Sequence, residues 1–246
     1  MKRISKVAIL IIAAVIFASL AFNACSIHPV SWNPPVKAGF KGNTALNEEL
    51  TAAQKISLGG WYGPEDIVFD SAGNIYAGVH KTEKNFKDGG IIKINTDGKA
   101  EEFYDAGSWV AGLHFDAGGS LIALSHKEGL ISIGPGKKVT TLASKDEYGK
   151  PFLIPNGLDI ATDGKIYFSN TSEKSAYTIN YGRKIILEMN PLGGLYCYDP
   201  VSKKVRTLIS GTYFGNGVVL SKDESYLLMV ETSKYRVLRY WLKGAN

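Results

Sequence analysis

Cysteine and histidine are scarce in this 246-residue chain, which contains two cysteines and four histidines. Cys25 belongs to an apolar N-terminal segment, so the sequence predicts no internal disulfide framework. We expect Cys197, in the segment GLYCYD, to be a small core residue. Long helical patterns are also missing after the N-terminal segment, where apolar strand patterns alternate with turns.

Positive charge is in only slight excess. The formal net charge is +5, but Lys2, Arg3 and Lys6 precede or begin the apolar N-terminal run. Without these three, 25 basic residues stand against 23 acidic ones. This balance gives no reason to expect a nucleic-acid partner, and the basic pairs in turn-like stretches are typical of solvated hairpin tips.

The first 25 residues have the composition of a targeting segment. A basic start, MKRISK, precedes the 16-residue apolar run VAILIIAAVIFASLAF, and this order is typical of a signal peptide or a membrane anchor. Three fates remain open: cleavage after small residues near Ala21, lipidation of Cys25 in FNAC, or retention as an anchor. We therefore expect an exported protein, periplasmic or otherwise extracytoplasmic, or one that is membrane-anchored. Residues 26–50, which contain Pro29, Pro34 and Pro35, are predicted to be a linker.

One pattern recurs four times in residues 51–246. EDIVFDSAGNI starts at Glu65, AGLHFDAGGSL at Ala111, NGLDIATDGKI at Asn156 and NGVVLSKDESY at Asn216. The intervals are 46, 45 and 60 residues, and the longest one contains an insertion at about 171–191. Each copy reads as a strand, a turn and a second strand, and a further hairpin follows. Four strands in about 45 residues indicate an all-β fold, a β-propeller of which about four blades are present.

Propeller geometry predicts a functional site at the start of the repeat. The innermost strands surround a central channel, so equivalent positions in successive blades form a ring. The first position of the repeat is Glu65, Ala111, Asn156 and Asn216. One carboxylate and two amides are oxygen donors that suit a hard cation such as calcium, whereas a softer metal would favour Cys or His. The alternative is that these polar side chains bind only water and neighbouring strands.

Three positions further on, His114 and Asp159 share a second repeat position in adjacent blades. A histidine beside an aspartate could act as a general base. Because side chains alternate along a strand, we expect this position on the face opposite Glu65 and Asn156. The sequence thus favours a packed His–Asp contact between blades, and it assigns no catalytic residue.

Three segments carry a resemblance to a known family: GPEDIVFD, IPNGLDIATDGKIYFSNTS and GTYFGNGVVLSKDESYLLMVETSKYRVLRYWLKG. They resemble strictosidine-synthase-like proteins, of the same six-bladed propeller superfamily as gluconolactonases (senescence-marker type) and paraoxonases. The resemblance is most specific at about 155–243. It implies a central calcium held by Glu65, Asn156 and Asn216, while a later acidic ligand of the relatives has no match before Asn246. We accordingly expect residues 51–246 to form part of a six-bladed ring.

The resemblance implies a calcium-dependent hydrolase of small-molecule lactones or aryl esters. Strictosidine synthase activity itself is not implied, because the catalytic glutamate of that enzyme would fall beyond Asn246. Two alternatives stay open: a non-catalytic propeller that binds a ligand or partner in the cell envelope, and an inactive fragment. Fold alone does not decide between them.

Overall fold

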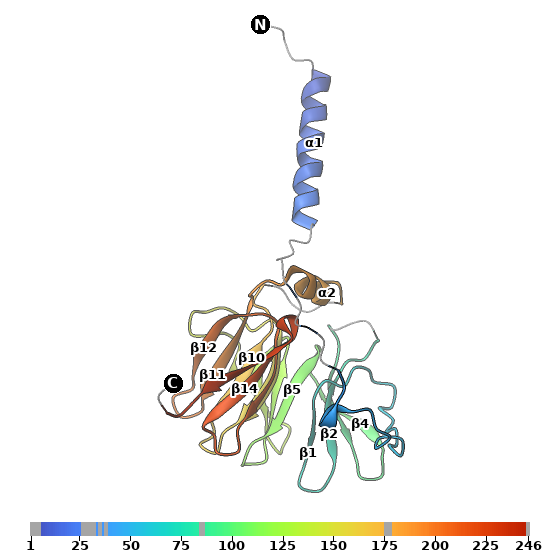
Figure 1. Ribbon diagram of the computed structural model, residues 1–246, viewed down its shortest axis with the longest axis vertical. Helices are drawn as coiled ribbons and strands as arrows, with labels where there is room; N and C mark the ends of the chain where they lie inside the picture. Colours follow the sequence, from blue (N-terminus) through green and yellow to red (C-terminus); the bar gives the residue numbers. More distant parts are fainter. Residues whose placement is uncertain are drawn as a thin grey trace.

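The computed structural model describes residues 6–25, 33, 36, 39–83, 87–174 and 179–244. Its body consists of four antiparallel sheets that stand side by side (Figure 1). Three sheets have four strands each, in the orders β1-β2-β3-β4, β5-β6-β7-β8 and β9-β10-β11-β12, and the fourth sheet contains β13-β14-β15. Within every sheet the strands follow one another in chain order, as consecutive hairpins require.

The elements have the following bounds. The strands are β1 Ile67–Phe69, β2 Ile75–Val79, β3 Gly90–Ile94, β4 Ala100–Asp105, β5 Val110–Phe115, β6 Leu121–Ser125, β7 Gly129–Ile133, β8 Val139–Ala143, β9 Pro155–Ile160, β10 Ile166–Asn170, β11 Gly193–Asp199, β12 Lys204–Thr212, β13 Gly215–Leu220, β14 Tyr226–Glu231 and β15 Arg236–Trp241. The helices are α1 Lys6–Cys25 and α2 Ile179–Glu188, with short 3-10 turns at Gly42–Thr44 and Thr232–Lys234.

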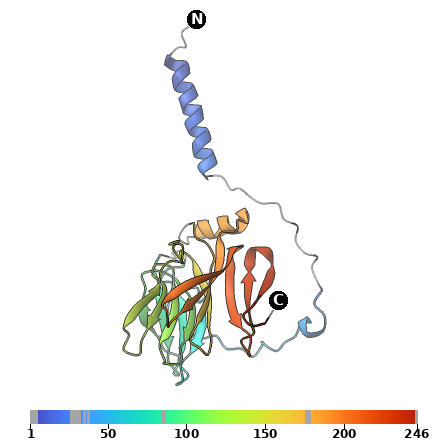
Figure 2. The same ribbon diagram turned by 90° about the vertical axis from the view of Figure 1, so that its left-hand side faces the viewer.

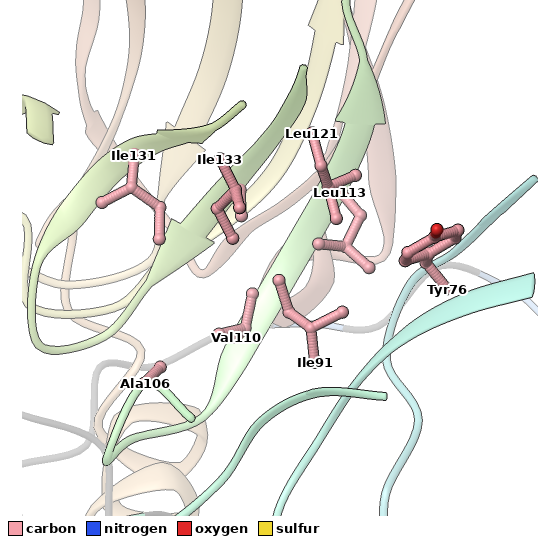
Figure 3. Packing of buried hydrophobic residues seen from close by; sticks show 9 residues of the cluster. Tyr76, Ile91, Ala106, Val110, Leu113, Leu121, Ile131 and Ile133 are labelled. Atoms are coloured by element: carbon pink, nitrogen blue, oxygen red, sulfur yellow. The ribbon is translucent and has the colours of Figure 1, made fainter. Parts of the chain in front are cut away.

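Apolar side chains from facing sheets pack together between the blades. The second strand of each of the first three sheets is nearly or fully buried, since both of its faces are covered, whereas β14 of the fourth sheet is only partly buried. Figure 3 shows the cluster between the first two sheets, in which Tyr76 and Ile91 meet Leu113 and Leu121. Corresponding clusters join the second sheet to the third and the third to the fourth. The core is therefore a series of layers between sheets.

The inner strands meet at the centre of this arrangement. β1 contacts β5, β5 contacts β9, and β9 contacts β13. This geometry confirms the predicted all-β fold and the β-propeller of the six-bladed type, with about four blades in the chain. Cys197 is buried in the layer between the third and fourth sheets, which confirms its core position.

Helix α2 was not anticipated from the sequence, which indicated only an insertion at about 171–191. Figures 1 and 2 show α2 lying across one end of the sheets. Its Ile185 is 2% exposed and packs with Ile154 and Phe214, residues that precede β9 and β13. The helix is short, and burial of this one face against the blades stabilises it more than its own propensity does.

Helix α1 covers the apolar N-terminal segment. Among the helices of the described residues, none is long and apolar enough to cross a membrane. The assignments of residues 1–25 to a signal peptide or anchor, of 26–50 to a linker, and of the chain to an exported location stay predictions.

Candidate functional site in the propeller channel

Each of three inner strands contains a β-bulge at the first position of the repeat. In β9 the pairs Asn170–Pro155 and Phe168–Leu158 leave two residues, Asn156 and Gly157, opposite the single residue Ser169. The same one-residue shift places two residues opposite one at the start of β5 and of β13. A bulge adds a residue to one strand and so reverses the side-chain alternation beyond it.

This bulge overturns the expectation that His114 and Asp159 face away from the Glu65 and Asn156 position. Three residues normally take a strand to its opposite face, but the extra bulge residue returns it to the same face. His114 and Asp159 therefore line the same cavity as Glu65 and Asn156. Their contact across two blades is as expected, with His114 Nε2 lying 3.4 Å from Asp159 Oδ1.

In three of the four copies glycine follows the first repeat position, where neighbouring backbones approach closely. A Cβ atom on Gly112 would lie 2.4 Å from the carbonyl oxygen of Asn156. On Gly157 it would lie 2.7 Å from Gly217 Cα and 2.8 Å from the carbonyl oxygen of Asn216. Such distances leave no room for a side chain, so these glycines set how closely the inner strands converge.

The cavity at the centre brings the predicted metal ligands together. Glu65, Ala111, Asn156 and Asn216 all line one hollow of about 400 Å³. Glu65, Asn156 and Asn216 also line a second hollow of about 220 Å³. That hollow continues toward α2, since its wall includes Ile154 and Phe214. The three oxygen-bearing side chains thus stand where the two hollows meet.

The two amides differ in how they are held. Asn216 donates its Nδ2 to Thr232 Oγ1 at 3.1 Å, which leaves Oδ1 as the amide atom that can bind a cation. Asn156 is 7% exposed, and its side chain makes no hydrogen bond to another residue within the described chain. A buried amide that faces a cavity without a protein partner is well suited to hold a ligand there.

The carboxylates of Glu65 and Asp66 crowd one side of the cavity. Although residue Glu65 is exposed to solvent, desolvation of its carboxylate and the nearby charge of Asp66 raise its pKa. Burial likewise raises the pKa of Asp66, while hydrogen bonds from the Leu113 and Ile67 amides and the proximity of His114 act in the opposite direction. Negative charge at this point is thus undercompensated by the protein, and a bound cation would relieve it.

Asp66 is a site residue that the repeat alignment did not single out. It stands at the position filled by glycine in the other three copies. Its Oδ2 accepts a hydrogen bond from Leu113 N of the next blade at 2.9 Å. Asp159 makes a similar contact from the third blade to the fourth, where its Oδ2 accepts a hydrogen bond from Leu220 N at 2.7 Å. Both carboxylates satisfy backbone donors on strand edges that face the channel. In the sequence, the replacement of glycine by Asp66 was the signal that could have identified this residue.

Within the described residues, no group of three or more His, Cys, Asp or Glu side chains is placed to hold a metal ion. The candidate set is of a different kind, a single carboxylate with two amides, and its metal-binding role stays a prediction. Calcium accepts such neutral oxygen donors together with water.

His126 lies close to the channel, directly after β6, and packs edge-on against Trp109 with ring centroids 5.3 Å apart. Burial lowers the pKa of its imidazole to about 4, and a hydrogen bond to the backbone of Pro155 acts in the opposite direction. The ring is neutral in the folded protein at physiological pH.

We expect His126 to make the fold acid-sensitive. In the unfolded chain a histidine has a pKa of about 6.5, so between about pH 6.5 and 4 the unfolded state takes up the proton first and stability falls as pH falls. The free energy of unfolding should decrease by about 2 kcal/mol from this group between pH 7.5 and 4.5. Urea denaturation of the His126→Gln variant should show a correspondingly smaller loss. Equal losses in the two proteins would contradict this assignment.

Four antiparallel blades around a channel, with an oxygen-lined cavity at the strand starts, define a β-propeller protein of the six-bladed type. Residues 156–245 match the family described as strictosidine synthase, and residues 42–81 match the family described as strictosidine synthase-like, N-terminal. The chain belongs to the strictosidine synthase-like family.

The comparisons with individual proteins agree with this family. The chain is 32% identical over 204 residues to the Arabidopsis thaliana protein Strictosidine Synthase-Like 6, covering 82% of this chain and 54% of that protein. Among solved structures, a gluconolactonase from Xanthomonas campestris has a TM-score of 0.55 at 16% identity, covering 71% of this chain and 56% of that one. Regucalcin from Agrobacterium tumefaciens, described as a calcium-binding protein, has a TM-score of 0.54 at 16% identity, covering 73% and 54%. The chain spans about half the length of the relatives it matches.

Proposed function

We propose that this chain carries the calcium site of a hydrolase that acts on lactones or aryl esters. The observation that carries the proposal is the shared cavity of Glu65, Asn156 and Asn216, three oxygen donors from three different blades. Equivalent positions of a repeat converge on an axis only in a ring-like fold, so their common residue chemistry points to a ligand on that axis.

Calcium is the ion that this donor set fits best. Carboxylate and amide oxygens are hard ligands, and calcium tolerates six to eight of them with the remainder supplied by water. Desolvation is the main cause of the raised pKa of Glu65 and of Asp66, and a cation bound beside these carboxylates would favour their charged forms. When bound, such an ion would polarise a substrate carbonyl and stabilise the negative charge that develops on its oxygen.

The chain's own residues would hold and orient the reacting groups. Thr232 fixes the amide of Asn216, and Ser169 ties two blades together by accepting from Gly157 N and donating to the Asn216 carbonyl. On the α2 side, Ile154, Phe214 and Trp109 supply an apolar wall to the smaller hollow. An ester or lactone carbonyl could lie against this wall and beside the oxygen donors, as small-molecule sites commonly combine apolar walls with a few polar groups.

The solved relatives support this reading in two separate ways. One is described as a gluconolactonase and one as a calcium-binding protein. Their likeness to this chain is in fold, so lactone hydrolysis and calcium binding pass to it only as part of this proposal.

A second candidate is a propeller that binds a ligand or partner without catalysis. Within the described residues, His114 is the one histidine that lines the channel cavities. Its Nδ1 lies 2.7 Å from the carbonyl oxygen of Phe115, and its Nε2 faces Asp159. With Nδ1 at a backbone carbonyl and Nε2 directed at a carboxylate of the next blade, the ring is better placed to join blades than to take a proton from water.

Hydrolysis assays separate the two candidates. The purified full chain should hydrolyse phenyl acetate or a small lactone in the presence of calcium, and EGTA should abolish the activity until calcium is restored. Activity that persists unchanged with EGTA would contradict a calcium-dependent hydrolase. Calcium binding without turnover of either substrate class would favour the non-catalytic propeller.

A further inference from the structure

The layer between the second and third blades contains a hollow of about 580 Å³, at the end of the strands away from α2. It lies among the turns that follow β5, β9 and β11, and its walls include Ile122 and Leu142 from one blade and Ile160, Ile166 and Tyr198 from the next. These apolar residues belong to the cluster that joins the two blades, so the hollow is an unfilled part of a packed layer.

The neighbouring layer is filled at the equivalent place by a tyrosine. Tyr76 lies opposite Lys93 and Val68 in the first blade, and Ile122 lies opposite Ser132 and His114 in the second. Ile122 therefore takes the position of Tyr76. The ring of Tyr76 is 6% exposed, with its centroid 4.9 Å from that of Phe103 and 5.2 Å from that of Phe115.

Three residues on this face of the first blade have smaller counterparts in the second blade. Tyr76, Lys93 and Phe103 of the first blade correspond to Ile122, Ser132 and Leu142. The third blade again carries a tyrosine, Tyr167, opposite Cys197. Packed layers leave few voids larger than a water molecule. Although Tyr198 of the third blade lines the hollow, no ring stands at the Ile122 position itself, and the space that Tyr76 fills one layer away stays open here.

The residue that accepts the tyrosine's hydrogen bond also has a counterpart beside the hollow. Tyr76 donates its hydroxyl to Asp70 Oδ2 at 3.3 Å, and Asp70 Oδ1 accepts from backbone amides of its own turn. Asp116, the equivalent residue of the second blade, lines the hollow and holds its turn in the same way. Its Oδ1 accepts from Gly118 N at 2.9 Å and from Ser120 N at 2.8 Å.

The other oxygen of Asp116 is left for a ligand. In the first blade Asp70 Oδ2 also accepts from the side chain of Asn74, which Ser120 replaces in the second. Asp116 Oδ2 receives no hydrogen bond from any residue of the described chain. The hollow thus offers a ring-sized apolar space next to a carboxylate oxygen that is ready to accept one hydrogen bond.

We infer that this inter-blade pocket binds a small phenol. The ring takes the place that Tyr76 occupies one layer away, and the hydroxyl donates to Asp116 Oδ2. A phenol has a pKa of about 10 and keeps its proton at neutral pH, so it can donate to a carboxylate. The pocket is separate from Glu65, Asn156 and Asn216, and binding there does not rest on calcium or on hydrolysis.

The test uses 4-methylphenol, which reproduces the tyrosine side chain from Cβ outward, and toluene, which lacks the hydroxyl. Calorimetric titration of the full chain in EGTA should show saturable 4-methylphenol binding with a Kd on the order of 0.1 mM, within reach of an eight-atom ligand. Toluene should bind about tenfold more weakly, because it loses a hydrogen bond to a charged acceptor. No saturable binding of 4-methylphenol at millimolar concentration would overturn the inference.

Two variants locate the binding. Ile122→Tyr supplies the missing ring from the chain itself and should abolish 4-methylphenol binding while raising the melting temperature. Asp116→Asn keeps an Oδ1 acceptor for the turn and should remove the preference for 4-methylphenol over toluene. Asp70→Asn is the matched control in the filled layer and should leave both affinities unchanged.

Two outcomes would overturn the inference. One is undiminished 4-methylphenol binding by folded Ile122→Tyr. The other is an unchanged preference for 4-methylphenol over toluene in Asp116→Asn, which decides the matter even if Ile122→Tyr fails to fold.

Discussion

Replacing Glu65 with glutamine should weaken calcium binding at least tenfold, which corresponds to about 1.4 kcal/mol. Glu65 supplies the formal negative charge among the three proposed ligands, and ligand charge is a principal determinant of calcium affinity. Glutamine keeps the size of the side chain and one oxygen donor, so the change isolates the charge. Calorimetric titration of calcium into the full chain measures the effect directly.

The design includes a graded and a neutral comparison. Asn156→Ala removes one neutral donor and should weaken calcium binding less than Glu65→Gln does. Glu101→Gln removes an equal charge from the exposed face of β4, in an outer strand that lines neither channel hollow, and should leave the affinity unchanged. Equal calcium affinity in Glu65→Gln and wild type would show that the ion, if it binds, is held elsewhere.

Replacing Gly157 with alanine should lower the free energy of unfolding by about 1–3 kcal/mol, the range expected when a well-packed region is overfilled. The new Cβ would fall within 3.0 Å of Gly217 Cα, the Asn216 carbonyl oxygen and Val218 N. All three are backbone atoms, so relief requires the third and fourth blades to move apart. Because Asn156 and Asn216 sit on the strands that would separate, calcium affinity should fall as well.

Gly136 is the matched control for this substitution. A Cβ atom there meets nothing within 4 Å, and its φ lies outside the left-handed region. Gly136→Ala should therefore change stability by less than about 0.5 kcal/mol, as is usual for surface positions. Denaturation in urea compares both variants with wild type, and a Gly157→Ala variant as stable as Gly136→Ala would contradict the close approach of the inner strands.

The repeat made the architecture accessible from the sequence. Four copies of one strand–turn–strand pattern at intervals of about 45 residues left few folds open, and the ring position of Glu65, Asn156 and Asn216 followed from the repeat alone. These positions lie in one cavity because the fold is periodic, which is a property that sequence spacing reports directly.

Other features depend on contacts between blades, which the spacing does not report. The face of His114 and Asp159 was mispredicted because a bulge of one residue reverses the alternation, and the bulge depends on how the second strand pairs. Helix α2 was missed because its burial against Ile154 and Phe214 involves residues far apart in the sequence. The hollow beside Ile122 could be recognised only after the register matched this residue to Tyr76.

A crystal structure of the protein grown with calcium would show the proposed ion and its ligands. We expect one ion at the meeting point of the two channel hollows, with side-chain oxygens of Glu65, Asn156 and Asn216 all within the ~2.3–2.6 Å typical of calcium. Glu65→Gln crystals at the same calcium concentration should show reduced occupancy at that position. A calcium ion bound elsewhere with these three side chains uncoordinated, or no ion in the channel at millimolar calcium, would rule out this calcium site.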